Sequence, residues 1–292
     1  MFAEFKHTLR RKRGAILGWG FGLAVYGVLM VLMFDSIADI EGMQELLAAY
    51  PKEIMAFFGG ADIMAITTAK GYVDLYYFAY MPVIVGIFAA VTGAGLLVGD
   101  EESGILDLIL SHPVSRTALF WGRVLGFVAA TLLILLISWL SWVVPAGSTS
   151  MDLSWVEFLQ PFVPLFAELL LFGTLALFLS MVLPSGRAAA AITSGLLVGD
   201  YLLQGLANLN ADLQSVVQYT PLHFYQGGDA IDGLNWGWLG ILVGASLGFV
   251  LLAWWRFQQR DVRVGGEGGW RLPRLPIGKK TKRESPAQPR AA

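Results

Sequence analysis

Six long apolar segments constrain the fold of this chain more than any other feature of its sequence. An α-helix rises 1.5 Å per residue and crosses the hydrocarbon core of a bilayer with about 20 apolar residues. Hydrophobic residues make up 56% of the 292-residue chain and charged residues only 14%, whereas soluble domains carry about 25% charged residues. The sequence therefore predicts an all-α integral membrane protein with six transmembrane helices, at residues 14–34, 77–99, 117–144, 158–183, 188–207 and 236–257.

The chain divides into a membrane domain and a tail. The six segments and their connections form one transmembrane domain at residues 1–260. Residues 261–292 are rich in Gly, Pro, Lys and Arg and have no hydrophobic periodicity, so we expect a basic, disordered cytoplasmic tail there. Because six helices and their loops use most of the length, any nucleotide-binding domain is expected on a separate polypeptide.

The distribution of positive charge predicts the orientation of the helices. Cytoplasmic segments of membrane proteins carry an excess of Lys and Arg. If both termini are cytoplasmic, 18 of the 20 Lys and Arg residues fall on the cytoplasmic side, and only Lys52 and Lys70 lie outside. The loop at residues 35–76 carries seven acidic residues, which fits the opposite side of the membrane. We therefore expect cytoplasmic N- and C-termini.

Motifs for catalysis are missing from the sequence or lie in the wrong context. The chain has no cysteine, and its three histidines fall in a basic terminus, a cytoplasmic loop and an outer loop, so they cannot converge on a metal. It has no Gly-x-x-x-x-Gly-Lys-[Ser/Thr] phosphate-binding loop. A Gly-x-Ser-x-Gly pattern at residues 244–248 lies in mid-span rather than at a strand-to-helix turn. We expect no catalytic residue, metal or cofactor in this chain, and so no enzyme activity of its own.

The connection between the second and third helices predicts a short amphipathic helix on the cytoplasmic face. It begins with the acids Asp100, Glu101 and Glu102, continues through apolar residues at helical spacing from Ile105, and ends before Pro113. An amphipathic helix can also lie on lipid, but three consecutive acids would be repelled by an anionic leaflet. A protein partner fits this segment better.

Two short motifs in this connection resemble a known family. Residues 102–106 read Glu-Ser-Gly-Ile-Leu and residues 113–116 read Pro-Val-Ser-Arg. ABC-2 type transporter permeases typically carry a Glu-x-Gly-Thr-Leu-like and a Pro-Val-Ser-Arg-like segment between their second and third helices, and the chain is similar to them. Ile105 stands where that family usually has Thr. A basic amphipathic helix at residues 2–13 and the 219–225 connection between the fifth and sixth helices extend the resemblance.

The resemblance implies the permease subunit of an ATP-binding-cassette exporter in the bacterial plasma (inner) membrane. Such a subunit forms the substrate path, pairs with a second copy, and couples to two copies of a separate ABC ATPase that binds ATP and Mg²⁺. It implies that the connection is a coupling helix, in which the residues that contact or position the ATPase would be Glu101, Glu102, Gly104, Leu106, Ile109, Leu110 and Arg116. It also implies an outer gate with Tyr219, Pro221, Phe224 and Tyr225. The polar, Gly-rich character of that outer connection is equally typical of an ordinary loop.

Two acidic residues, Glu168 and Asp200, fall inside the predicted fourth and fifth helices at similar depth. An intramembrane carboxylate costs about 2.5–3.5 kcal/mol on insertion scales and usually faces a cavity or a partner. One interpretation is a polar patch on the substrate path or dimer contact. The other is a structural acid, protonated or bonded to Thr193, Ser194 or Gln204.

Two functions of other classes compete with an ABC permease on the residues alone. The first is a proton-coupled secondary transporter that uses Glu168 and Asp200, which should show inverted repeats that the sequence lacks. The second is a membrane scaffold protein. The tryptophans gather near helix ends, where their rings prefer the lipid headgroup layer, so the expected surroundings are a lipid bilayer and not nucleic acid.

Overall fold

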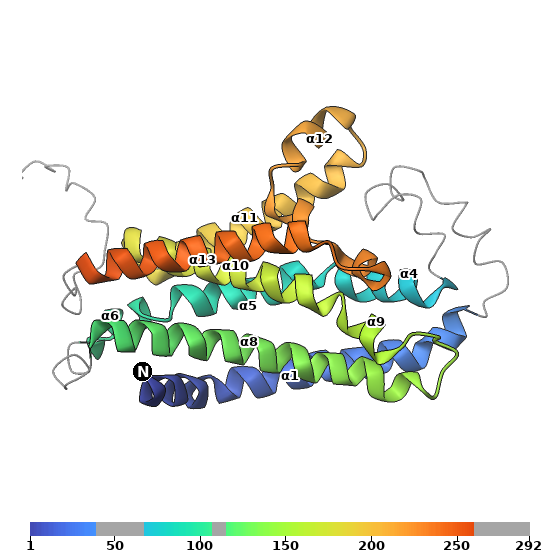
Figure 1. Ribbon diagram of the computed structural model, residues 1–292, viewed down its shortest axis with the longest axis horizontal. Coiled ribbons are helices and arrows are strands. Elements are labelled where there is room, and N and C mark those ends of the chain that lie inside the picture. The colour runs from blue at the N-terminus through green and yellow to red at the C-terminus, as the bar shows by residue number, and fades with distance from the viewer. Residues whose placement is uncertain (39–66, 107–114, 260–292) are drawn as a thin grey trace, which may run out of the picture.

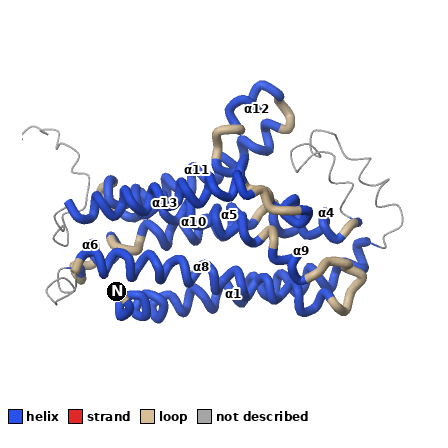
Figure 2. Tube along the Cα trace, in the orientation of Figure 1, coloured by secondary structure: helices blue, strands red, loops and turns tan. Residues whose placement is uncertain are grey.

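The computed structural model describes residues 1–38, 67–106 and 115–259. These residues form helices joined by turns (Figures 1 and 2). In chain order the elements are α1 (Phe2–Ala38), α4 (Ala69–Val73), the π-helix η2 (Asp74–Phe78), α5 (Met81–Ala94), α6 (Val98–Glu102), α8 (Arg116–Ala146), α9 (Trp155–Leu159), α10 (Phe162–Val182), α11 (Gly186–Ala207), α12 (Ala211–Val217), the 3-10 helices η3 (Pro221–Phe224) and η4 (Gly227–Asp232), and α13 (Trp236–Gln259).

Six helical stretches are long and apolar enough to cross a membrane, which confirms the predicted fold class. They cover Phe2–Ala38, Ala69–Ala94, Arg116–Ala146, Trp155–Val182, Gly186–Ala207 and Trp236–Gln259. The last four of them begin and end within a few residues of the predicted bounds. The first and the second differ more.

The second span is displaced from the prediction at both ends. It begins at Ala69, before two charged residues that lower the hydropathy of this region. Both have partners, since Lys70 pairs with Asp229 and Asp232, and Asp74 accepts a hydrogen bond from the amide of Gly228. Helix α5 ends at Ala94, earlier than predicted. The chain then turns into the separate helix α6.

The predicted amphipathic stretch at residues 2–13 and the first span form one continuous helix, α1. Helix α1 lies along α8 (Figure 1). Two glycines of α8 allow this close approach, since a Cβ atom at Gly122 would lie 2.6 Å from the Cβ of Glu4, and one at Gly126 would lie 2.7 Å from the Cβ of Thr8. The contact fixes the N-terminal end of α1 against the bundle.

Helix α10 lies at the centre of the bundle and packs against α5, α11 and α13. Its contact with α5 is tightest at two glycines, where a Cβ atom at Gly93 would overlap the backbone carbonyl of Gly173. Helices α1 and α8 form one edge of the molecule, and α11 and α13 form the other, with α12 projecting sideways beyond α11 (Figure 1). The N-terminus, α6, the start of α8 and the end of α13 lie at the same end (Figure 1).

Candidate functional site

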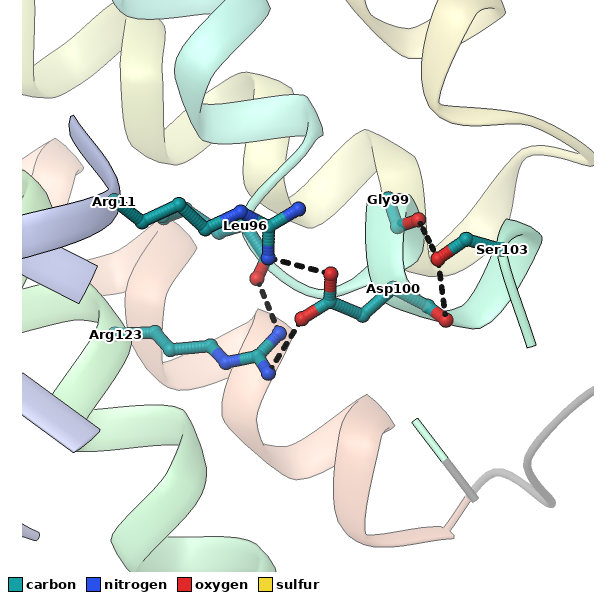
Figure 3. A network of polar contacts seen from close by, with 6 residues as sticks. All are labelled: Arg11, Leu96, Gly99, Asp100, Ser103 and Arg123. Atoms are coloured by element: carbon teal, nitrogen blue, oxygen red, sulfur yellow. Dashed lines mark hydrogen bonds and ion pairs between the residues drawn. The ribbon is translucent and has the colours of Figure 1, made fainter. Parts of the chain in front are cut away.

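A buried ion-pair cluster lies at the end of the bundle where α1 begins. Asp100 of α6 is 2% exposed, and each of its carboxylate oxygens contacts a different arginine (Figure 3). Oδ1 accepts a hydrogen bond from Nη1 of Arg11 at 2.5 Å, and Oδ2 lies 2.7 Å from Nη2 of Arg123. Charge-assisted contacts of this kind are the stronger ones in proteins. They join α6 to α1 and α8.

Arg123 also stabilises the break between α5 and α6. Its Nη1 donates a hydrogen bond of 2.7 Å to the carbonyl oxygen of Leu96, in the turn between the two helices. Carbonyls at a helix end lack a partner within the helix and need one elsewhere. The planar guanidinium therefore holds the turn with one N–H group while it pairs with Asp100 through another (Figure 3).

Arg11, Asp100 and Arg123 were not among the residues predicted to couple to the ATPase. Three of those predicted residues, Glu101, Glu102 and Leu106, contact the rest of the chain or are buried in it. The carboxylate of Glu102 accepts a hydrogen bond of 2.9 Å from the amide of Gly186, at the start of α11. Glu101 and Leu106 are buried, and Leu106 belongs to the main hydrophobic core. The predicted Ile109 and Leu110 lie outside the described residues.

Two of the predicted residues flank residues 107–114, which lie outside the described part of the chain. Gly104 has a φ of 70°, in the left-handed region that favours glycine, so the turn after α6 depends on the missing side chain. Arg116 begins α8 and contacts the end of α13: its Nη1 donates to the carbonyl of Phe257 at 3.4 Å, and its guanidinium lies 6.0 Å from that ring. The start of α8 and the end of α13 thus meet at Arg116.

A second polar site lies where α11 meets the turn before α13. The Oδ2 atom of Asp200 accepts a hydrogen bond of 2.9 Å from the backbone amide of Leu222 in η3. One turn further along α11, the amide of Gln204 donates to the hydroxyl of Thr220 at 3.1 Å. The structure thus joins the predicted intramembrane acid Asp200 to the segment predicted as the outer gate.

The predicted gate residues divide into packed and exposed ones. Tyr225 donates a hydrogen bond of 3.0 Å to the carbonyl of Phe78 in the second span. Burial, and then the nearby carboxylates of Asp74 and Glu168, raise the pKa of Tyr225 well above its ordinary value of 10.0, so this hydroxyl remains a donor. Phe224 packs edge-on against Trp238 of α13. Pro221 begins η3, whereas Tyr219 is 80% exposed.

The turn that follows is attached to the start of the second span. The Oδ1 atom of Asp74 accepts a hydrogen bond of 2.6 Å from Gly228 in η4. Lys70 lies 2.6 Å from Asp232 and 3.2 Å from Asp229. The sequence analysis did not single out these contacts, because residues more than 150 positions apart in the chain give no local signal for pairing.

Glu168 differs from Asp200 in having no polar partner. It is fully buried in α10, and neither carboxylate oxygen has a hydrogen-bond partner among the described residues. Buried polar groups usually have a partner, so an acid without one is a functional candidate. The described residues contain no group of three or more His, Asp or Glu that could hold a metal ion.

The comparison with known families decides between the alternatives. The sequence profile of a family described as ABC-2 family transporter protein matches residues 4–262, which include all six spans. The chain belongs to this family. A search of curated proteins finds no match. As a member of the ABC-2 family, the chain is a multi-pass membrane protein and a transport component of an ABC transporter rather than its ATPase.

Proposed function

We propose that this ABC-2 family member is the permease subunit of an ABC exporter in a bacterial plasma membrane. It would form the substrate path, pair with a second copy, and bind two copies of an ABC ATPase that holds ATP and Mg²⁺. Both termini would be cytoplasmic, as the positive-inside distribution of Lys and Arg indicates.

The observation that carries the proposal is the arrangement around the connection between the second and third spans. On its way to that connection the chain passes through α6, whose side chains contact α1, α8 and α11. On the other side of the connection, Arg116 contacts the end of α13. A protein that binds here would act on four of the six spans at once. This is the arrangement that an ATPase needs in order to move a permease.

The experiment is co-purification of the tagged protein with the ATPase, using a substitution on the surface of this segment. Leu106 belongs to the chain's own core, so Leu106→Asp would disturb folding. Ile105 is 46% exposed and lies beside it. We expect the wild type to retain a protein with a Gly-x-x-x-x-Gly-Lys-[Ser/Thr] loop and Ile105→Asp to retain less than a tenth as much, because buried apolar interface residues typically contribute about 2 kcal/mol or more.

The matched control is Val216→Asp. Val216 is also an exposed apolar residue, but it lies on α12, away from this end of the bundle. It should leave the ATPase bound. If the wild-type protein retained no ATPase, the proposal would fail.

A further inference from the structure

Polar side chains connect the short helix α6 to three of its neighbours, and its Val98 is buried in the main hydrophobic core. It has five residues, from Val98 to Glu102. Arg11 contacts it from α1, Arg123 from α8, and its own Glu102 accepts the amide of Gly186 at the start of α11. Asp100 is the member that takes two of these three contacts (Figure 3).

We propose that Asp100 is a positioning residue for energy coupling, which makes α1 and α8 follow any movement of α6. This inference rests on the proposed function, since it takes α6 to be moved by the bound ATPase. It assigns Arg11 and Arg123 as the two arginines through which the movement passes, one on each neighbouring span.

Burial is the physical reason why α6 and the two spans should move together. The side chains of Asp100 and Arg123 are 2% and 4% exposed. Separating them would leave a charge out of water without a partner, which is strongly unfavourable. The low-energy movements are therefore those that keep Asp100 against its arginines. Without these ion pairs, α6 would be freer to slide against α1 and α8.

Arg123 also fixes the orientation of α6 relative to the preceding turn. Its Nη1 donates to the carbonyl of Leu96, and its Nη2 contacts the carboxylate of Asp100. Because the guanidinium is planar and rigid, these two contacts fix the orientation of α6 relative to the turn after α5. A lysine offers a compact charge without this fork. Gly104, with its φ of 70°, provides the bend that follows α6.

The test measures whether nucleotide still changes the opposite end of the molecule. Because the chain has no cysteine, Tyr219→Cys introduces a single reporter at an 80% exposed position in the outer connection. Its labelling rate with a maleimide is measured in the purified permease–ATPase complex, without nucleotide and with ATP plus vanadate. We expect a nucleotide-dependent rate in the wild-type background. With Asp100→Asn, we expect the ATPase to stay bound and active while that rate change falls at least about fivefold, the lower end of typical coupling.

Arg11 provides a variant that does not remove a buried charge. Arg11→Gln should reduce the rate change, whereas the matched control Arg10→Gln, an exposed arginine one position away, should not. If Asp100→Asn failed to assemble, Arg11→Gln would decide the question. Arg123→Lys should keep the charge and still lose the rate change.

The outcomes separate this inference from the function on which it rests. A wild-type complex that binds no ATPase, or whose labelling does not respond to nucleotide, would overturn the proposed function and the inference with it. A responsive wild type whose Asp100→Asn and Arg11→Gln variants respond equally well would overturn the inference alone.

Discussion

The two intramembrane acids have different surroundings, although they lie on neighbouring helices. Asp200 accepts a hydrogen bond from the backbone of η3 and so fixes the turn that precedes α13. Glu168 has no hydrogen-bond partner among the described residues and is fully buried. A buried carboxyl group without a partner lowers stability. Asp200 therefore has a structural role that the geometry accounts for, and Glu168 is the acid whose presence requires a function.

This difference predicts opposite effects on stability. Replacing Glu168 with Leu, which has a similar volume, should leave the melting temperature unchanged or raise it, because an unsatisfied buried carboxyl group costs about 1–3 kcal/mol. Asp200→Ala should lower the melting temperature, because the amide of Leu222 loses its acceptor. Thermal unfolding of the purified variants in detergent measures both. A loss of stability in Glu168→Leu as large as that in Asp200→Ala would show that Glu168 is structural.

At the scale of elements, glycines decide which helices lie in close contact. Gly122 and Gly126 bring α8 against α1, and Gly93 brings α5 against α10. Gly195, Gly199 and the glycines of α13 at positions 240, 244 and 248 have open space around them. Glycines four positions apart thus lie in a helix contact in one case and in open space in the other. Their spacing alone does not predict which pairs pack against a neighbouring helix of this chain.

The element that should respond most to a glycine substitution is the α1–α8 pair. In Gly126→Leu the new side chain would meet Thr8, so α1 must move away from α8, at a cost of about 1–3 kcal/mol or more for overpacking. We expect a lower melting temperature and a smaller nucleotide-dependent labelling change at Tyr219→Cys, since α1 also carries Arg11. The control Gly244→Leu changes an open position on α13 and should not alter thermal unfolding. Equal melting temperatures for the two variants would contradict the close contact.

At the scale of the whole molecule, the two ends of the bundle have different chemistry. One end gathers arginines around α6, and the other joins the second span to η4 through Lys70 and the amide of Gly228. Helices α10 and α13 pack against each other along the bundle. Under the proposed function, helices such as these would carry movement from the ATPase to the outer opening.

The orientation of the whole molecule is testable because the chain has no cysteine. Single cysteines at Ser36 and Ser148 should react with a membrane-impermeant thiol reagent in intact cells, since both positions are exposed at the outer end. A cysteine at Ser285, in the tail, should react only after the cells are permeabilised. Labelling of Ser285 in intact cells would reverse the proposed topology.

Sequence alone was sufficient to predict the six spans and the family. These properties are local, because a segment of about 20 apolar residues must form its backbone hydrogen bonds within itself to cross a bilayer. The same local reasoning also identified Glu168 and Asp200 as acids inside spans. It placed the second span several residues from its observed position, because it assigned the charged residues Lys70 and Asp74 to the preceding loop, whereas both have partners at the start of the span.

The partners of the charged side chains required the three-dimensional structure. Arg11 and Asp100 are 89 positions apart in the chain, and Asp74 and Gly228 are 154 apart. No periodicity connects such positions, since the pairing depends on which helices the fold places side by side. The same holds for the difference between Asp200 and Glu168. Both are acids in apolar helices, but the turn at Leu222 reaches only one of them, because the path of the chain after α11 brings that backbone amide to Asp200.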